Sequence, residues 1–399
     1  MNLPMLPANQ QPRYEGQGWT HWPDYPELSL QFLRALGAAQ EGAGTISECF
    51  LAASRMVPGD LESWYQEWQR VADVNVRRAC AALAGGHLHT AKANFLRASS
   101  YYRSSELFLA PNDSRRGETF QKILANSHAY LGLISPIGEI LSVDVGDGTT
   151  LDAYFLKPSS GATCWPTIIC FGGLDGSKDE LLAKMPRYAL SRGMALLLVD
   201  MPGQGGTLRR RFTVNRADSE VPVGRCIDFL LTRADVDGER IALYGASMGG
   251  IYSARAASDE RRIKAVVSDS LTFDIHAELQ QRLSHPDASM WMHLKWVYGC
   301  ETPQEVVEKS RDFRMSDFIG KIECPYLIVQ GEHDFLGLQT ALDAFHFAKT
   351  RAVPVELKVF DAEETGASHC QADNPALGQE FICDWVAEKL DIKQSISAC

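Results

Sequence analysis

Apolar residues recur every three or four positions through the first part of the chain, and this spacing predicts helices. The stretch DLESWYQEWQRVADVNVRRACAALAGG carries one such stripe, with Asp60 placed to cap the helix and Gly85 to end it. The next stretch, HLHTAKANFLRASSYYRSSELFL, carries another. Two helical segments joined by a short glycine turn favour a helical hairpin. Trp64 and Trp68 fall on the apolar stripe, so we expect them in the core of a helical region that ends near residue 130.

The pattern changes after Ile137, where short apolar runs replace the helical stripes. Two of them, GEILSVDVG and TLDAYFLKP, are separated by a glycine-containing turn and predict a β-hairpin. Further runs then alternate with amphipathic segments: PTIICFGG, MALLLVDMPG, RIALYGAS, IKAVVSD, CPYLIVQGEHD and VPVELKVFDAE. This alternation predicts an α/β fold with a mainly parallel, doubly wound sheet covered on both faces. Residues 274–318 interrupt it and predict a cap insertion. We therefore expect a helical N-terminal or lid domain over 1–130 and an α/β domain over 131–399.

Composition narrows the classes of protein and partner. The 399 residues suffice for two domains, and 45% hydrophobic with 22% charged residues is typical of a soluble globular protein. A formal net charge of −11 argues against nucleic acid or an anionic membrane as partner. The start of the chain lacks the pattern of a signal peptide, and no apolar run reaches membrane-spanning length. We expect a cytoplasmic protein.

The ten cysteines are scattered, without CxxC pairs or zinc-like Cys/His spacing. We expect free thiols rather than a disulfide framework, and neither a metal nor a cofactor.

Ser247, in the middle of GASMG, is the strongest candidate for chemistry. Gly245 and Gly249 flank it two residues away on each side, between an apolar run and a helical segment. In that strand–turn–helix context, G-x-S-x-G is the signature of a nucleophile elbow, because the glycines allow a sharp turn without Cβ clashes. The alternative is an ordinary glycine-rich connection.

A serine nucleophile needs a base, and the base needs an orienting carboxylate. Asp334 follows the run YLIVQG, and His369 lies in VFDAEETGASHCQ, so the chain order Ser, Asp, His is that of an α/β-hydrolase. Ser247, Asp334 and His369 are therefore the predicted catalytic residues. Asp334 is preferred because it lies further into its loop, while the other acids and the rival base that stay open are Glu332, Asp269, Asp361 and His333.

An oxyanion hole is expected to use backbone N–H groups from two places. One is Met248, directly after the nucleophile. The other is the loop CFGGLDGSKDE, where the donor is Leu174 or Gly173, with an ordinary strand-end turn as the alternative. The segment VDMPGQGG lacks the lysine and the spacing of a phosphate-binding loop and is assigned to the scaffold.

Two further residues are weaker candidates for substrate binding. Glu278 lies in the predicted cap, where a solvated charge is the alternative. Tyr102, with its neighbours Tyr101 and Arg103, lies in the helical region, where core packing is the alternative. The basic cluster Arg209–Arg211 is expected on a solvated face, with an anionic substrate group as the alternative partner.

Together these segments resemble a branch of the α/β-hydrolases in which a helical domain precedes the hydrolase core. This branch includes 2,6-dihydroxypseudooxynicotine hydrolase and fungal polyketide-shortening hydrolases of pigment pathways. The quoted motifs GEHD, GASMGG, VDMPGQG and GASHC are shared widely among serine hydrolases, whereas RASSYYR together with GGLD is more specific. The resemblance implies the triad named above, suggests Glu278 as an extra acid, and implies a homodimer.

The resemblance also implies the reaction. Such relatives cleave a carbon–carbon bond next to a carbonyl in a β-diketone-like or polyketide substrate, through an acyl-enzyme. The same residues would cleave an ester of a secondary metabolite. The alternatives are a general carboxylesterase or peptidase, a cyclase or condensation catalyst, and a binding protein on a retired hydrolase fold. In each enzymatic case the expected partner is a small-molecule substrate.

Overall fold

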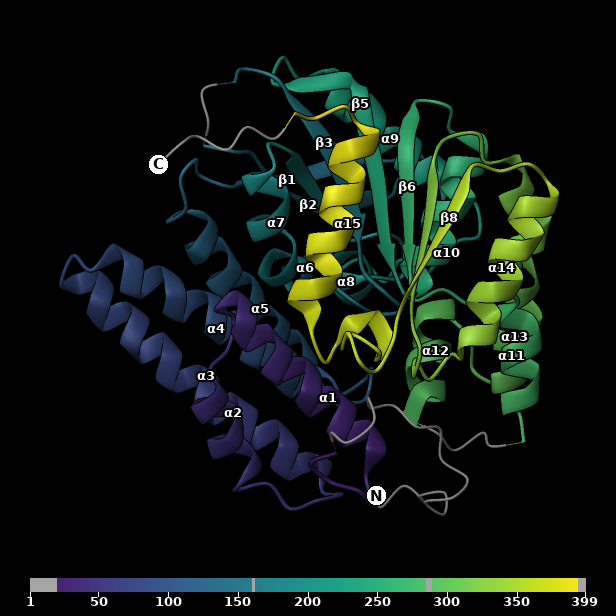
Figure 1. The fold of residues 1–399 in the computed structure, drawn as a ribbon. Helices are drawn as coiled ribbons and strands as arrows, with labels where there is room; N and C mark the ends of the chain where they lie inside the picture. Colours follow the sequence, from purple (N-terminus) through teal and green to yellow (C-terminus); the bar gives the residue numbers. More distant parts are fainter. Residues whose placement is uncertain (1–19, 160–161, 285–288, 394–399) are drawn as a thin grey trace.

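The computed structural model describes residues 20–159, 162–284 and 289–393. Figure 1 shows a group of helices from the first third of the chain lying beside an α/β unit built on one sheet.

The helices described ahead of the sheet are α1 (Pro26–Gly37), α2 (Ile46–Ala53), α3 (Leu61–Ala84), α4 (Leu88–Glu106) and α5 (Ser114–Leu131). The predicted helical hairpin is confirmed as α3 and α4, which lie side by side (Figure 1). Asp60 caps α3, because its side chain accepts a hydrogen bond from the N–H of Glu62. Trp64 and Trp68 are buried, as expected.

The eight strands form one sheet in the order β1-β2-β4-β3-β5-β6-β7-β8. Their bounds are β1 (Glu139–Asp144), β2 (Thr150–Leu156), β3 (Trp165–Phe171), β4 (Ala195–Val199), β5 (Val236–Ala246), β6 (Ile263–Asp269), β7 (Tyr326–Gly331) and β8 (Val355–Phe360). β1 and β2 form the predicted antiparallel hairpin, and from β4 through β8 every neighbouring pair is parallel. The carboxyl ends of the central strands therefore meet at one edge, where open α/β sheets bind ligands.

Helices cover both faces of this sheet. They are α6 (Lys178–Lys184), α7 (Pro186–Ser191), α8 (Gly205–Arg209), α9 (Glu220–Leu231), α10 (Met248–Asp259), α14 (Leu338–Thr350) and α15 (Pro375–Lys389). Between β6 and β7 lie α11 (Ile275–Arg282), α12 (Ser289–Tyr298) and α13 (Pro303–Ser310), within the expected cap insertion. The division into domains at residue 130 and the limits of the cap stay predictions.

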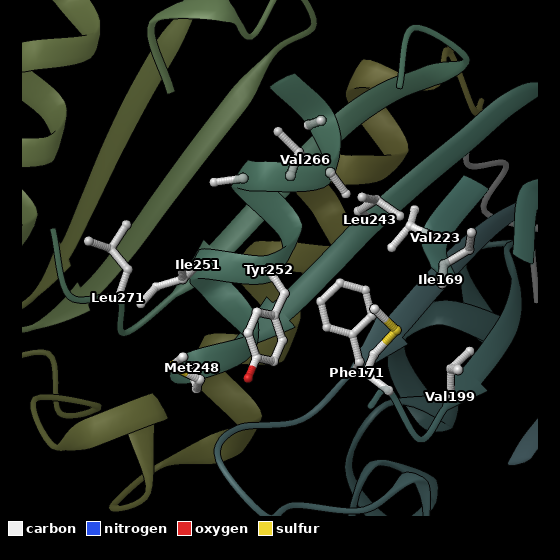
Figure 2. Close-up of a cluster of buried hydrophobic side chains, with 14 of the residues drawn as sticks. Ile169, Phe171, Val199, Val223, Leu243, Met248, Ile251, Tyr252, Val266 and Leu271 are labelled. Atoms are coloured by element: carbon white, nitrogen blue, oxygen red, sulfur yellow. The ribbon is translucent and has the colours of Figure 1, made fainter. Parts of the chain in front are cut away.

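Alternating side chains of each strand build two separate cores. Along β3, Ile169 and Phe171 pack in the core under α9 and α10, whereas Ile168 and Cys170 pack in the core under α7 and α15. Figure 2 shows the first of these cores, where Tyr252 of α10 lies close to Phe171. Burial on both faces fixes the register of the central strands, and thereby the position of the loops at their carboxyl ends.

Two further findings concern the cysteines and the helices. The cysteines within residues 20–159, 162–284 and 289–393 are free thiols. None of the helices in the described ranges is both long and apolar enough to cross a membrane.

Candidate active site

Ser247 stands on a strained turn between the end of β5 and the start of α10. Its φ of 56° and ψ of −121° are rare for a residue with a side chain, and such a conformation costs on the order of 1–3 kcal/mol. The turn is held by the N–H of Ser247, which donates to the carbonyl of Asp269 at 2.6 Å. A Cβ on Gly245 would lie 1.9 Å from the carbonyl oxygen of Gly249, so the chain can pass this closely only because Gly245 has no side chain.

The structure brings the three predicted catalytic residues together. Nε2 of His369 lies 3.0 Å from Oγ of Ser247, and Nδ1 of the same ring lies 2.9 Å from both carboxylate oxygens of Asp334. The side chain of Asp334 is fully buried, and its Oδ1 also accepts the N–H of Leu336. A carboxylate on Nδ1 leaves Nε2 free to take the hydroxyl proton, which is the arrangement of a serine nucleophile with its base and orienting acid.

The electrostatics of His369 follow from the same contacts. Burial by itself lowers the pKa of this imidazole, but the adjacent Asp334 carboxylate more than offsets burial, with a further contribution from Cys370. The pKa of His369 therefore lies well above its ordinary value of 6.5.

The rival acids lie elsewhere. Glu332 is exposed and accepts the N–H of Ala362, and Asp361 accepts two N–H groups of its own turn. Asp269 is buried, but its carboxylate is bound by the hydroxyl of Tyr244 and the amide of Gln371. No described hydrogen bond joins His333 to Ser247.

Glycine residues after β3 bring the predicted oxyanion loop against the nucleophile. A Cβ on Gly173 would lie 3.4 Å from Oγ of Ser247. The backbone of this loop therefore lies next to the position that a reacting carbonyl has to take. Among the hydrogen bonds of the described residues, none has the N–H of Gly173, Leu174 or Met248 as its donor. Met248 is the first residue of α10, where N–H groups lack partners within the helix. These N–H groups are free to bind an oxyanion.

A cavity of about 380 Å³ opens onto Ser247 and His369. Residues of α1, α4, α6 and α12 line it together with the oxyanion loop, so both the helical region and the predicted cap contribute to its walls. Its lining is mixed, with apolar side chains such as Leu30, Leu107 and Phe108 beside polar ones such as His293.

Buried ion pairs hold the helical region against the sheet beside this cavity. Arg103 of α4 donates to Glu180 of α6 at 2.7 Å, and Asp175 of the oxyanion loop receives both Arg103 and Arg209. Glu106 accepts from Arg209 at 2.6 Å. Burial raises the pKa of Glu106, but the surrounding arginines hold this pKa below its ordinary value. Each of these buried charges has lost its hydration, and only the opposite charges beside it compensate for that loss. Each charge therefore depends on its partners.

One prediction about this cluster concerns stability. Arg103, Arg116 and Arg209 all pair with Glu106. In Glu106→Gln these arginines keep their charge in the interior without the shared carboxylate, so we expect a loss of about 3–5 kcal/mol of unfolding free energy. Urea unfolding measures it. The control is Glu62→Gln, which removes an exposed pair with Arg115 and should cost about 1 kcal/mol or less. Equal effects of the two variants would contradict the proposed dependence on burial.

Several weaker sequence interpretations require correction. Arg209 does not lie on a solvated face: its side chain is 2% exposed and enters the ion-pair cluster, whereas Arg210 and Arg211 pair with Asp152 nearer the surface. Tyr102 is buried, donates to Asp73 and is not among the residues that line the cavity.

Glu278 also stands outside the cavity lining. On α11 it accepts from Arg282 one turn along, at 2.6 Å. Local pairing at this spacing satisfies the charge without any substrate.

Comparison with known proteins identifies the family. The family model described as "Esterase FrsA-like" matches residues 58–295, which span both the helical hairpin and the nucleophile elbow. The chain belongs to the FrsA-like esterase family. Among curated relatives, the hydrolase LUC6 of a Fusarium species is 31% identical over 351 residues, 77% of this chain and 82% of that protein. The 20-hydroxy-prefusarin hydrolase FUS2 of Gibberella moniliformis is 30% identical over 353 residues, again 77% and 82%.

Solved structures show that the fold of this FrsA-like chain is shared. The 2,6-dihydroxy-pseudo-oxynicotine hydrolase superposes with a TM-score of 0.74 at 23% identity, covering 89% of this chain and 95% of that one. AbyA5 gives a TM-score of 0.69 at 16% identity, covering 91% and 94%. The predicted α/β-hydrolase fold and the predicted resemblance are thus confirmed, and the protein is a hydrolase.

Sequence reasoning missed several residues at the site. Gln204 was assigned to the scaffold, yet its side chain binds the oxyanion loop. Glu27 and His293, which are 266 residues apart (293 − 27), line the same cavity. Only the closeness of VDMPGQGG to a strand end indicated Gln204, and no local motif marks Glu27 or His293.

Proposed function

We propose that this protein is a serine hydrolase that works through an acyl-enzyme on Ser247. The single observation that carries the proposal is the continuous contact from the hydroxyl of Ser247 through His369 to the buried Asp334, at the wall of a cavity. These contacts argue against a binding protein on a retired hydrolase fold, because binding alone needs neither the strained turn at Ser247 nor a histidine paired with it.

The chemistry follows from these contacts. His369 takes the proton of Ser247 as its oxygen attacks a substrate carbonyl, and the resulting alkoxide binds the N–H groups of Met248 and of Gly173 or Leu174. The intermediate collapses by breaking the bond to the leaving group, which His369 protonates. Water then hydrolyses the acyl-enzyme. One water is consumed, giving a carboxylic acid and either an alcohol or a C–H product.

The proposed substrate is a small secondary metabolite of the β-diketone or polyketide type, cleaved at a carbon–carbon bond next to a carbonyl, or an ester of such a molecule. The cavity volume falls in the range of small-molecule sites, about 300–1,000 Å³. The names of FUS2 and of the solved neighbour each specify a small organic substrate. His293, 8% exposed, lines the cavity with its Nδ1 3.5 Å from a carboxylate oxygen of Asp175, and its ring offers a polar group to a substituent of the substrate. A carbanion leaving group has to be delocalised by a second carbonyl or a phenol ring.

Activity-based labelling tests the proposal. A fluorophosphonate should form one covalent adduct with the wild type, and peptide mass spectrometry should locate it on Ser247. The matched control is Ser253→Ala, which removes a buried serine of α10 that donates within its own helix and to β6, and it should label like the wild type. A wild type that forms no adduct would sink the proposed function.

A screen of aryl β-diketones, lactones and matched esters in H₂¹⁸O then separates the candidate bonds. Carbon–carbon hydrolysis places one ¹⁸O in the carboxylic acid and a new C–H in the other fragment. A net cyclisation or condensation gives no ¹⁸O-labelled acid. A cytoplasmic location and a homodimer remain predictions from the sequence.

A further inference from the structure

The side chain of Gln204 contacts the oxyanion loop through two carbonyl groups of the loop. Its Nε2 lies 2.6 Å from the carbonyl oxygen of Gly172 and 2.6 Å from that of Gly173. Two carbonyl acceptors require both hydrogens of a primary amide, so the NH₂ end faces the loop. The other end agrees with this orientation, because Oε1 accepts the N–H of Met201. Gln204 is completely buried, so bulk solvent does not compete for these bonds.

These two bonds determine where the loop N–H groups point. In a planar trans peptide, the C=O and the N–H of one unit point in opposite directions. Holding the carbonyl of Gly172 therefore fixes the N–H of Gly173, and holding the carbonyl of Gly173 fixes the N–H of Leu174. Both N–H groups are turned away from Gln204, and both residues line the cavity beside Ser247.

The loop has little intrinsic resistance to peptide rotation. Gly172, Gly173 and Gly176 lie within five residues, and glycine gives the backbone the widest range of conformations. A flipped unit would place a carbonyl oxygen where a substrate oxyanion has to bind.

Neighbouring contacts hold the ends of the loop but not these two peptide units. The N–H of Gly205 donates to the carbonyl of Gly176, and Arg209 donates to the carbonyl of Asp175. The side chain of Gln204, in contrast, bonds directly to the two peptide units whose N–H groups are the candidate donors.

We propose that Gln204 is a positioning residue that preorganises the oxyanion hole by holding the carbonyls of Gly172 and Gly173 away from the cavity. This inference rests on the proposed function, since an oxyanion forms only if Ser247 attacks a carbonyl. It assigns the segment VDMPGQGG a catalytic task through the loop that it binds.

The test uses full-length Gln204→Met, which keeps the volume and loses both donors, and Gln204→Glu, which keeps the shape and presents oxygens to the two carbonyls. With 4-nitrophenyl acetate, we expect kcat to fall on the order of 10²-fold with KM unchanged, as when one oxyanion donor is lost. Phenylboronic acid, which forms a tetrahedral adduct on serine, should lose affinity in parallel. The control is Gln69→Met, which removes another buried glutamine amide, one that donates to the hydroxyls of Ser105 and Thr119.

The outcomes separate this inference from the proposed function. A wild type that forms no fluorophosphonate adduct overturns both. A labelled wild type with Gln204→Met as active as Gln69→Met overturns the inference alone. A fall in kcat that matches a fall in thermal stability, with unchanged boronate affinity, also overturns it. The inference is supported if Gln204→Met loses kcat and boronate affinity in parallel while its melting temperature stays that of the wild type.

Discussion

Ser247→Ala should lower kcat by about 10⁵- to 10⁶-fold while the substrate still binds, since the hydroxyl is the only group lost from the relay. His369 then has no proton to take, and the cavity keeps its walls. Steady-state turnover of the substrate found in the screen measures the loss, and a direct binding assay with Ser247→Ala measures the retained affinity. A variant that keeps more than a trace of turnover contradicts the covalent mechanism.

A second substitution at the same position separates chemistry from folding. Alanine keeps the backbone strain at φ 56°, whereas Ser247→Gly relieves it. We therefore expect Ser247→Gly to be just as inactive but to melt at a higher temperature, by the equivalent of about 1 kcal/mol. Activity and stability that fall together in both variants would indicate that Ser247 serves the turn alone.

Asp334→Asn should lower kcat by about 10³- to 10⁴-fold, although the side chain keeps its shape. The asparagine amide donates to Nδ1 of His369, which places the proton on Nε2, and that atom can then no longer accept the proton of Ser247. The wild-type contact distance of 2.9 Å puts the carboxylate within the reach that this mechanism needs.

The same variant should change the pH dependence, with a sign that follows from the contacts. Catalysis needs neutral His369, and Asp334 raises its pKa well above 6.5. In the wild type, kcat/KM should therefore fall as the pH drops through this raised pKa. In Asp334→Asn only burial remains as the main influence on His369, and burial lowers the pKa, so the acidic limb should move to lower pH.

Glu332→Gln is the control for both effects, because Glu332 was one of the alternative acids and its exposed carboxylate accepts the N–H of Ala362. It should keep the activity and the pH profile of the wild type. An acidic limb that moves in Glu332→Gln but not in Asp334→Asn would reverse the assignment of the acid.

Local sequence was informative wherever a function depends on a short segment. The turn at Ser247 is a strand followed by G-x-S-x-G and a helix, and the residues that make it recognisable lie within a few positions of one another. The α/β alternation was predicted from continuous apolar runs, because a strand that is buried on both faces needs apolar residues at nearly every position. Arg209 shows the limit, since its burial depends on carboxylates from α4 and from the oxyanion loop.

The sequence by itself determined the order of strands and helices, the nucleophile turn, and the set of residues from which the acid and base had to come. Only the tertiary structure placed Asp334, rather than Glu332, Asp269 or Asp361, within hydrogen-bond distance of His369, because that distance depends on how the loops after β6, β7 and β8 meet. It also decided that Gln204 binds the oxyanion loop and that Tyr102 and Glu278 stand away from the cavity. The physical reason is the same in each case: side-chain contacts form between segments far apart in the chain, and no local pattern encodes such a distance.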